Sequence, residues 1–134
     1  MRVVIAGGGL TGLALARLLR GHGLEPTVLE RGAAGVWMPR PFLLPFHGFA
    51  CLREAGVFDR IHAAGWEVAP RADGDPVAVA VAFTSAVGIV ADGLPVEHET
   101  EVRALLREED RVRGVRVRVG DQPRPSHERC PPPA

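Results

Sequence analysis

A run of glycines near the N-terminus is the feature of this chain whose residue types and spacing are best suited to chemistry. It satisfies the pattern G-x-G-x-x-G in the string Gly7-Gly8-Gly9-Leu10-Thr11-Gly12. The first glycine of such a pattern allows a tight turn, the second lets a pyrophosphate approach the backbone, and the third permits close helix–strand packing. The N–H groups at the start of the following helix would face the phosphates. The pattern predicts a dinucleotide site formed by these six residues.

An acidic residue follows at the place where the ribose of such a dinucleotide would lie. Glu30 stands eighteen residues beyond Gly12, close to the spacing of about 20 residues typical of a ribose-binding acid. Its carboxylate can accept hydrogen bonds from both ribose hydroxyls and would repel a 2′-phosphate, which disfavours NADP here. The neighbouring Arg31 weakens that exclusion. A glycine-rich turn without a ligand is the alternative, but its glycines cost stability that an empty site does not require.

Three elements must position these groups. Residues 3–6 form a short apolar run rich in β-branched side chains, typical of a parallel strand that is covered on both faces. From Leu10 the apolar residues recur at helical spacing, and Gly21 and Gly23 end the helix. Residues 26–30 are a second strand, and a helix-long connection implies that the two strands are parallel. The predicted fold class is α/β, with a Rossmann-like βαβ unit that binds FAD or NAD(P).

The middle of the chain gives weaker signals. Prolines and a glycine predict a loop over residues 32–45, followed by a helix over residues 46–55 and a short helix that Asp59 caps and that runs to residue 64. Residues 66–76 carry turn signals. Residues 77–91 lack charges, but they are too few for a membrane helix, which needs about 20 residues. Their alternation of valine and alanine favours a buried strand.

The last part of the chain predicts an antiparallel β-hairpin. Residues 96–107 alternate between apolar and charged side chains, which favours a half-exposed strand over a helix beginning at Thr100. A turn over residues 108–111 leads to a second strand, with a bulge at Gly114. The prolines of residues 122–134 indicate disorder. We therefore expect four parts: residues 1–66 with the βαβ unit and following helices, an apolar segment 67–93, the hairpin 94–120, and a disordered tail 121–134.

Composition narrows the range of partners. Sixteen basic and sixteen acidic residues give no net charge, so nucleic acid and membrane surfaces are not expected partners. The glycines interrupt the N-terminal apolar stretch, which argues against an export signal. Cys51 and Cys130 form no metal-ligand pattern, and the spacing of His47 and Cys51 is better explained by a buried thiol than by a metal site. We expect a cytoplasmic protein with no metal site.

Residues 3–16 together with Val28-Leu29-Glu30-Arg31 resemble the N-terminus of FAD-dependent monooxygenases of the aromatic-ring hydroxylase type, which are related in fold to p-hydroxybenzoate hydroxylase. Residues 44–57 are similar to the family's next helix, and residues 96–119 look like its following strand pair. The resemblance implies that Gly7, Gly9, Gly12 and Glu30 hold the ADP half of FAD. Arg40 is a weaker match to the family's arginine near the flavin pyrophosphate.

The resemblance also implies an activity and its cofactors. In this family NAD(P)H reduces the flavin, and oxygen is then used to hydroxylate a small organic substrate. Family members are about three times longer, and Gly120-Asp121 only imitates their second FAD motif, so we expect an incomplete domain without assignable catalytic residues. Two alternatives remain open. The chain is either a small dinucleotide-binding module that works with a partner chain or self-associates, or a gene fragment without function.

Overall fold

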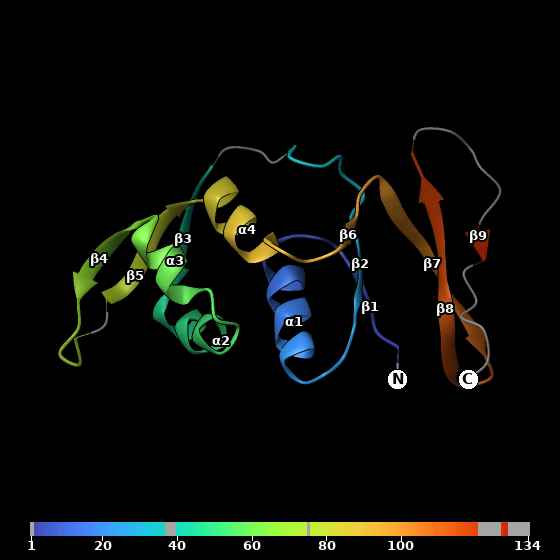
Figure 1. The fold of residues 1–134 in the computed structure, drawn as a ribbon, viewed down its shortest axis with the longest axis horizontal. Helices are drawn as coiled ribbons and strands as arrows, with labels where there is room; N and C mark the ends of the chain where they lie inside the picture. Colours follow the sequence, from blue (N-terminus) through green and yellow to red (C-terminus); the bar gives the residue numbers. More distant parts are fainter. Residues whose placement is uncertain (1, 37–39, 75, 121–126, 129–134) are drawn as a thin grey trace.

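The computed structural model describes residues 2–36, 40–74, 76–120 and 127–128. Figure 1 shows three small sheets placed along the long axis of the molecule, with the helices between the first two. In chain order the elements are β1 (Val4–Ala6), α1 (Leu10–Gly21), β2 (Thr27–Leu29), β3 (Pro41–Pro45), the 3-10 turn η1 (Phe46–Gly48), α2 (Phe49–Glu54), α3 (Phe58–Ala63), β4 (Trp66–Pro70), β5 (Pro76–Ala82), α4 (Phe83–Ala91), β6 (Val96–Glu97), β7 (Thr100–Glu108), β8 (Arg111–Val119) and β9 (His127–Glu128).

The N-terminal βαβ unit is confirmed. Strands β1 and β2 pair in parallel with Ile5 opposite Val28, and β6 joins them with Val96 opposite Val28 on its other side. Helix α1 connects β1 to β2 and buries Leu13 and Ala16 against the sheet and its neighbours. This arrangement is an incomplete Rossmann-like α/β domain with a parallel sheet of three short strands.

A second sheet has the order β3-β5-β4, and its two outer strands lie where the sequence predicted a loop and turns. The prediction of a loop through residue 45 was wrong for β3, and that of turns over residues 66–76 was wrong for β4. Pro41 and Pro45 misled the prediction, because they terminate an edge strand in which a missing N–H costs little. The partner of both strands is β5, which pairs antiparallel with each of them.

The apolar segment after residue 76 is divided between two elements. In β5 the side chains of Ala78, Val79 and Val81 are buried, so the predicted buried strand is confirmed as far as Ala82. The chain then turns into α4, which the sequence did not predict because Val and Ile are typical of both buried strands and buried helices. The two elements contribute Val79, Val81, Val87 and Val90 to the main core.

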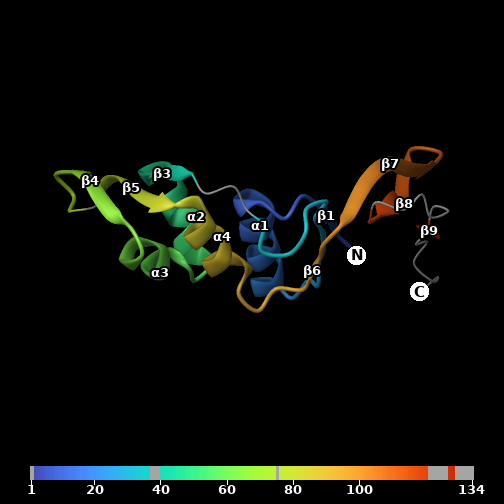
Figure 2. The same cartoon turned by 90° about the horizontal axis from the view of Figure 1, so that it is seen from above.

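The side chain of Arg17 on α1 contacts the end of helix α4. The guanidinium of Arg17 donates hydrogen bonds to the carbonyls of Val90 (2.7 Å), Ile89 (3.4 Å) and Asp92 at the end of α4. Carbonyls at a helix C-terminus lack partners within the helix, and a cation is favourable there. This contact therefore ties the second sheet and its helices to the dinucleotide-type unit, as the central position of α4 in Figures 1 and 2 indicates.

The predicted hairpin is confirmed as β7 and β8, which pair antiparallel. The expected strand 96–107 is interrupted, since β6 belongs to the parallel sheet and the chain changes direction at Glu99, which has a φ of 52°. The bulge is present beside Gly114: Leu106 faces Gly114 while Arg107 faces Val112, which leaves Arg113 as the extra residue. Two residues of the expected tail form β9 against β8, and the rest of that tail lies outside the described residues.

Two smaller predictions were wrong. Helix α3 follows Val57 and has no side-chain cap, and Asp59 lies inside its first turn, where a carboxylate still interacts favourably with the helix dipole. The thiol of Cys51 is exposed rather than buried, because α2 directs Phe49 and Leu52 into the core. Cys130 lies outside the described residues.

Candidate functional site

The glycine loop and Glu30 lie side by side at the carboxyl ends of two neighbouring parallel strands. The loop follows β1 and Glu30 follows β2, and the last residues of these strands, Ala6 and Leu29, are paired. The N–H of Gly7 continues this pairing with a 2.8 Å hydrogen bond to the carbonyl of Leu29. Ligands of open α/β sheets bind at this edge, beyond the carboxyl ends of the strands.

Two glycines of the loop are required by its backbone. Gly7 has a φ of +111°, a conformation that side chains disfavour. A Cβ on Gly12 would lie 2.1 Å from the carbonyl oxygen of Gly7 and 3.2 Å from Cγ2 of Ile5. Gly12 therefore allows α1 to pack closely against β1, as the sequence pattern predicts for the third glycine.

The start of α1 offers free hydrogen-bond donors. Gly9 precedes the helix in an extended conformation with no side-chain cap, and no acidic residue occupies the first turn. Within the described residues, the N–H groups of Gly9, Leu10, Thr11 and Gly12 have no hydrogen-bond partner. A helix start carries about half a positive elementary charge, so these groups are suited to bind a phosphate.

The second glycine of the pattern has open space in front of it. A Cβ built on Gly9 would meet no atom within 4 Å, so nothing inside the folded chain requires glycine there. The absence of a side chain does leave the backbone accessible to a ligand, which is the role the pattern assigns to this position. The residues present at this edge therefore fit the diphosphate of a dinucleotide.

The carboxylate of Glu30 is held by two backbone groups. Its Oε2 accepts a 2.7 Å hydrogen bond from the N–H of Gly8, and its Oε1 accepts one of 2.7 Å from the N–H of Gly32. The sequence did not assign a role to Gly32. A glycine two residues beyond the acid that ends a strand is the signal that could have identified it.

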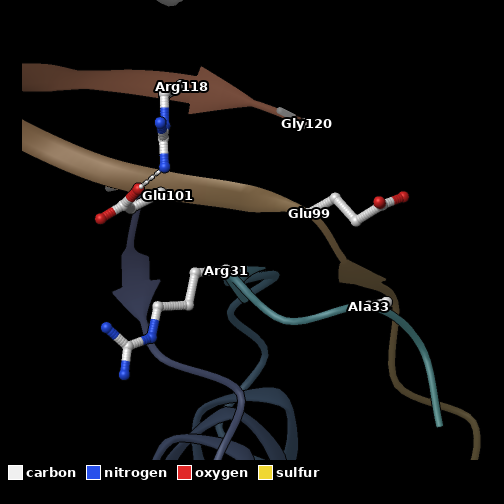
Figure 3. Close-up of a pocket in the computed structure, with 6 residues that line it drawn as sticks. All are labelled: Arg31, Ala33, Glu99, Glu101, Arg118 and Gly120. Atoms are coloured by element: carbon white, nitrogen blue, oxygen red, sulfur yellow. Dashed lines mark hydrogen bonds and ion pairs between the residues drawn. The ribbon is translucent and has the colours of Figure 1, made fainter. Parts of the chain in front are cut away.

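A pocket of about 220 Å³ is lined by Arg31, the residue that follows Glu30 in the chain. Its lining residues come from the segment after β2, from β7 and the residue before it, and from the end of β8 and the residue after it, as Figure 3 shows; they are Arg31, Ala33, Glu99, Glu101, Arg118 and Gly120. Arg118 and Glu101 form an ion pair of 2.9 Å across the hairpin. Of these residues the sequence predicted a role in cofactor binding only for Arg31, because the others become its neighbours only when the hairpin folds.

Arg40 lies at a different element from the glycine loop and Glu30. Arg40 precedes β3, and its guanidinium carbon lies 4.5 Å from the ring centroid of Phe83, the first residue of α4. Such a cation–π contact orients the side chain without neutralising it. Its part in pyrophosphate binding stays a prediction.

The described part of the chain contains neither a metal-ligand cluster nor a membrane-spanning helix. No group of three or more His, Cys, Asp or Glu residues there is arranged to hold a metal ion. No helix in that part is long and apolar enough to span a membrane.

Comparisons with known proteins agree with this geometry. Residues 1–72 match the family model described as FAD binding domain. Flavin-containing monooxygenase ustF2 of Aspergillus flavus is 41% identical over 63 residues, which are 46% of this chain and 12% of the relative. The chain therefore spans about an eighth of that relative's length.

Solved structures show the same fold. The substrate-free rebeccamycin biosynthetic enzyme RebC matches with a TM-score of 0.70 and 18% identity, over 87% of this chain and 28% of that one. A candidate FAD-containing monooxygenase from Photorhabdus luminescens matches with a TM-score of 0.72 and 22% identity, over 90% and 36%. At these identities the likeness concerns the fold alone, and the chain covers about a third of each neighbour.

Proposed function

This chain belongs to the FAD binding domain family, and from that premise we propose that it binds the ADP half of FAD as part of a flavin-dependent monooxygenase. The observation that carries the proposal is the pairing of a helix start that has free N–H donors with a carboxylate at the next strand end. Gly9, Leu10, Thr11 and Gly12 would hold the diphosphate, and Glu30 would hold the adenosine ribose.

The other predicted residues have supporting roles in this proposal. Gly7 and Gly8 shape the loop, and Arg31, which follows Glu30, lines the pocket in which the adenine would lie. A guanidinium can stack on such a ring. Arg40 would approach the pyrophosphate from the start of β3.

When bound, FAD supplies the redox chemistry with oxygen, and NAD(P)H is the reductant that we propose. The chain's own residues bind and orient the cofactor's adenosine end. We propose a small organic substrate, a cytoplasmic location, and no nucleic acid or membrane partner. The division at residues 66, 93 and 120 likewise stays a prediction.

A second candidate is a binding module that works with a partner chain or a second copy. The outer face of the β3-β5-β4 sheet supports it, because Leu43 and Trp66 flank Ala80 on this face and are 56% and 70% exposed. An apolar sheet face of this kind is typical of an interaction surface.

Titration with FAD, followed by oxygen uptake with NADH or NADPH over phenolic substrates, tests the proposal. We expect weak FAD binding and no hydroxylase turnover by the 134-residue chain, because the described residues provide a grip only for the adenosine end. A displacement of about 1 Å at the reacting centre can cost about a hundredfold in rate. Complete absence of FAD binding would contradict the proposed site. Oxygen uptake coupled to hydroxylated product would show that this chain is a working enzyme by itself.

A further inference from the structure

We infer that Gly8 and Gly32 are positioning residues, which fix the carboxylate of Glu30 in the orientation that selects a ribose with a free 2′-hydroxyl. This inference rests on the proposed function and deepens it. The two glycines act on opposite oxygens, with the N–H of Gly8 on Oε2 and the N–H of Gly32 on Oε1, each at 2.7 Å. Hydrogen bonds to a charged group are stronger than those between neutral groups, so the carboxylate is held before any ligand arrives.

The space around Gly8 and Gly32 also supports their role in positioning Glu30. A Cβ on Gly8 would lie 3.0 Å from Cβ and 3.4 Å from Oε2 of Glu30, and a Cβ on Gly32 would lie 3.2 Å from Oε1. Gly8 and Gly32 are absent from the glycines with positive φ, so alanine at either position meets the Glu30 side chain and not a backbone constraint. Glycine at both positions gives this carboxylate room, and an added Cβ would make its side chain shift by a few tenths of an ångström.

The backbone around Gly32 is held by hydrogen bonds to the residues where β6 ends and β7 begins. The carbonyl of Gly32 accepts a 3.1 Å hydrogen bond from the N–H of Glu99, and the carbonyl of Glu30 accepts one of 2.9 Å from Thr100. The N–H of Glu30 donates to the carbonyl of Glu97 at 2.8 Å. Residues 97–100, from the end of β6 to the start of β7, therefore hold both ends of the turn that carries the carboxylate.

With these two hydrogen bonds made, the carboxylate of Glu30 can still accept hydrogen bonds from a ribose. Each carboxylate oxygen has two lone-pair sites, so the N–H bonds of Gly8 and Gly32 leave one site on each oxygen for a ribose hydroxyl. The N–H of Gly8, by contrast, is committed to Glu30 and is not a phosphate donor. Preorganisation of this kind improves affinity and selectivity because less freedom is lost on binding.

The test compares ADP with 2′-deoxy-ADP, using ¹H–¹⁵N NMR titrations of the whole chain. The parent is expected to prefer ADP. Gly8→Ala and Gly32→Ala are each expected to reduce this preference about tenfold, the equivalent of one hydrogen bond to a charged group. Gly88→Ala, whose Cβ would meet nothing within 4 Å on α4, is the matched control and should keep the parent's preference. Retention of the parent's ratio by both alanine variants would overturn the inference.

A second measurement separates positioning from a general effect on folding. In the free protein, Glu30→Gln should move the amide resonances of both Gly8 and Gly32, and unchanged resonances would overturn the inference without reference to any ligand. In the Glu30→Gln background, Gly8→Ala should cause no further loss of the ADP preference. A full additional loss would mean that Gly8 acts independently of Glu30.

The same experiments distinguish failure of the inference from failure of the proposed function. If the parent binds ADP and 2′-deoxy-ADP equally, or binds neither, the proposed ribose site is wrong and the inferred selectivity falls with it. If the parent prefers ADP and the alanine variants do so equally, the ribose site stands and only the positioning role is contradicted.

Discussion

The N–H of Gly8 donates a 2.7 Å hydrogen bond to Oε2 of Glu30, although the two residues are 22 positions apart in the chain. This contact is a consequence of the parallel pairing of β1 and β2, whose last residues lie opposite each other. The glycine loop and the acid thus form one unit in the free chain.

Gly9→Val should abolish adenine-dinucleotide binding and leave the helical circular dichroism signal nearly unchanged. The new side chain would enter open space in the free protein, so it should not disturb folding, but it would occupy the approach to the backbone that a pyrophosphate needs. Calorimetry measures the affinity for FAD or ADP. Gly88→Val on α4 serves as the control, and an unchanged affinity in Gly9→Val would contradict the site assignment.

Glu30→Gln should weaken binding of FAD or ADP by about 1–3 kcal/mol, the range for a polar group left imperfectly paired. The amide has one oxygen in place of two equivalent acceptors, so it cannot accept hydrogen bonds from Gly8, Gly32 and both ribose hydroxyls. A competition assay against the parent measures the difference. Equal affinity of the two proteins would place ribose recognition elsewhere.

Gly12→Ala should lower the free energy of unfolding by about 1–3 kcal/mol, as overpacking does at a close contact. The added Cβ would lie 2.1 Å from the Gly7 carbonyl oxygen, so the loop and helix must separate. Urea denaturation measures the change. Gly21→Ala at the end of the same helix, where a Cβ would meet nothing, should leave stability equal or slightly higher. Equal stability of Gly12→Ala and the parent would contradict the close packing.

The sequence predicted those parts of the fold whose signal is local. The βαβ unit follows from apolar runs around a glycine-rich turn, and the hairpin follows from alternation over β7 and β8. Strands β3 and β4 escaped prediction because their pairing with β5 is a long-range property, and because prolines at an edge resemble loop signals. Helix α4 was not predicted, because the hydrophobic periodicity of a continuous apolar run does not distinguish a buried helix from a buried strand.

The candidate site was predictable to a similar extent. Gly7, Gly9, Gly12 and Glu30 follow from spacing alone, since each has a role in a known geometry. The role of Gly8 and Gly32 depends on where the Glu30 side chain turns. The pocket residues Glu101 and Arg118 depend on the fold of the hairpin.

Self-association should depend on Trp66. The valines that residues 77–90 contribute to the core are covered, whereas Leu43, Trp66 and Val68 of the second sheet are exposed. Light scattering after size exclusion should give a mass above 14.3 kDa for the parent at high concentration. Trp66→Glu should return the mass towards the monomer, because a charge opposes burial of that face.

Val112→Glu is the control for this experiment, because Val112 is also exposed, at 54%, but lies on the hairpin. It should leave the mass of the parent unchanged. Equal masses for the parent and Trp66→Glu would exclude the outer face of the second sheet as the surface of association.

The central claim is that this chain recognises the ADP half of FAD, and separate titrations with ADP and FMN followed by ¹H–¹⁵N NMR test it most directly. The account predicts that ADP moves the amide resonances of Gly9, Leu10, Thr11 and Gly12 at the start of α1, and that FMN leaves them unchanged at the same concentration. Shifts produced by FMN and not by ADP, or ADP-dependent shifts confined to residues outside the glycine loop and the surroundings of Glu30, would contradict it.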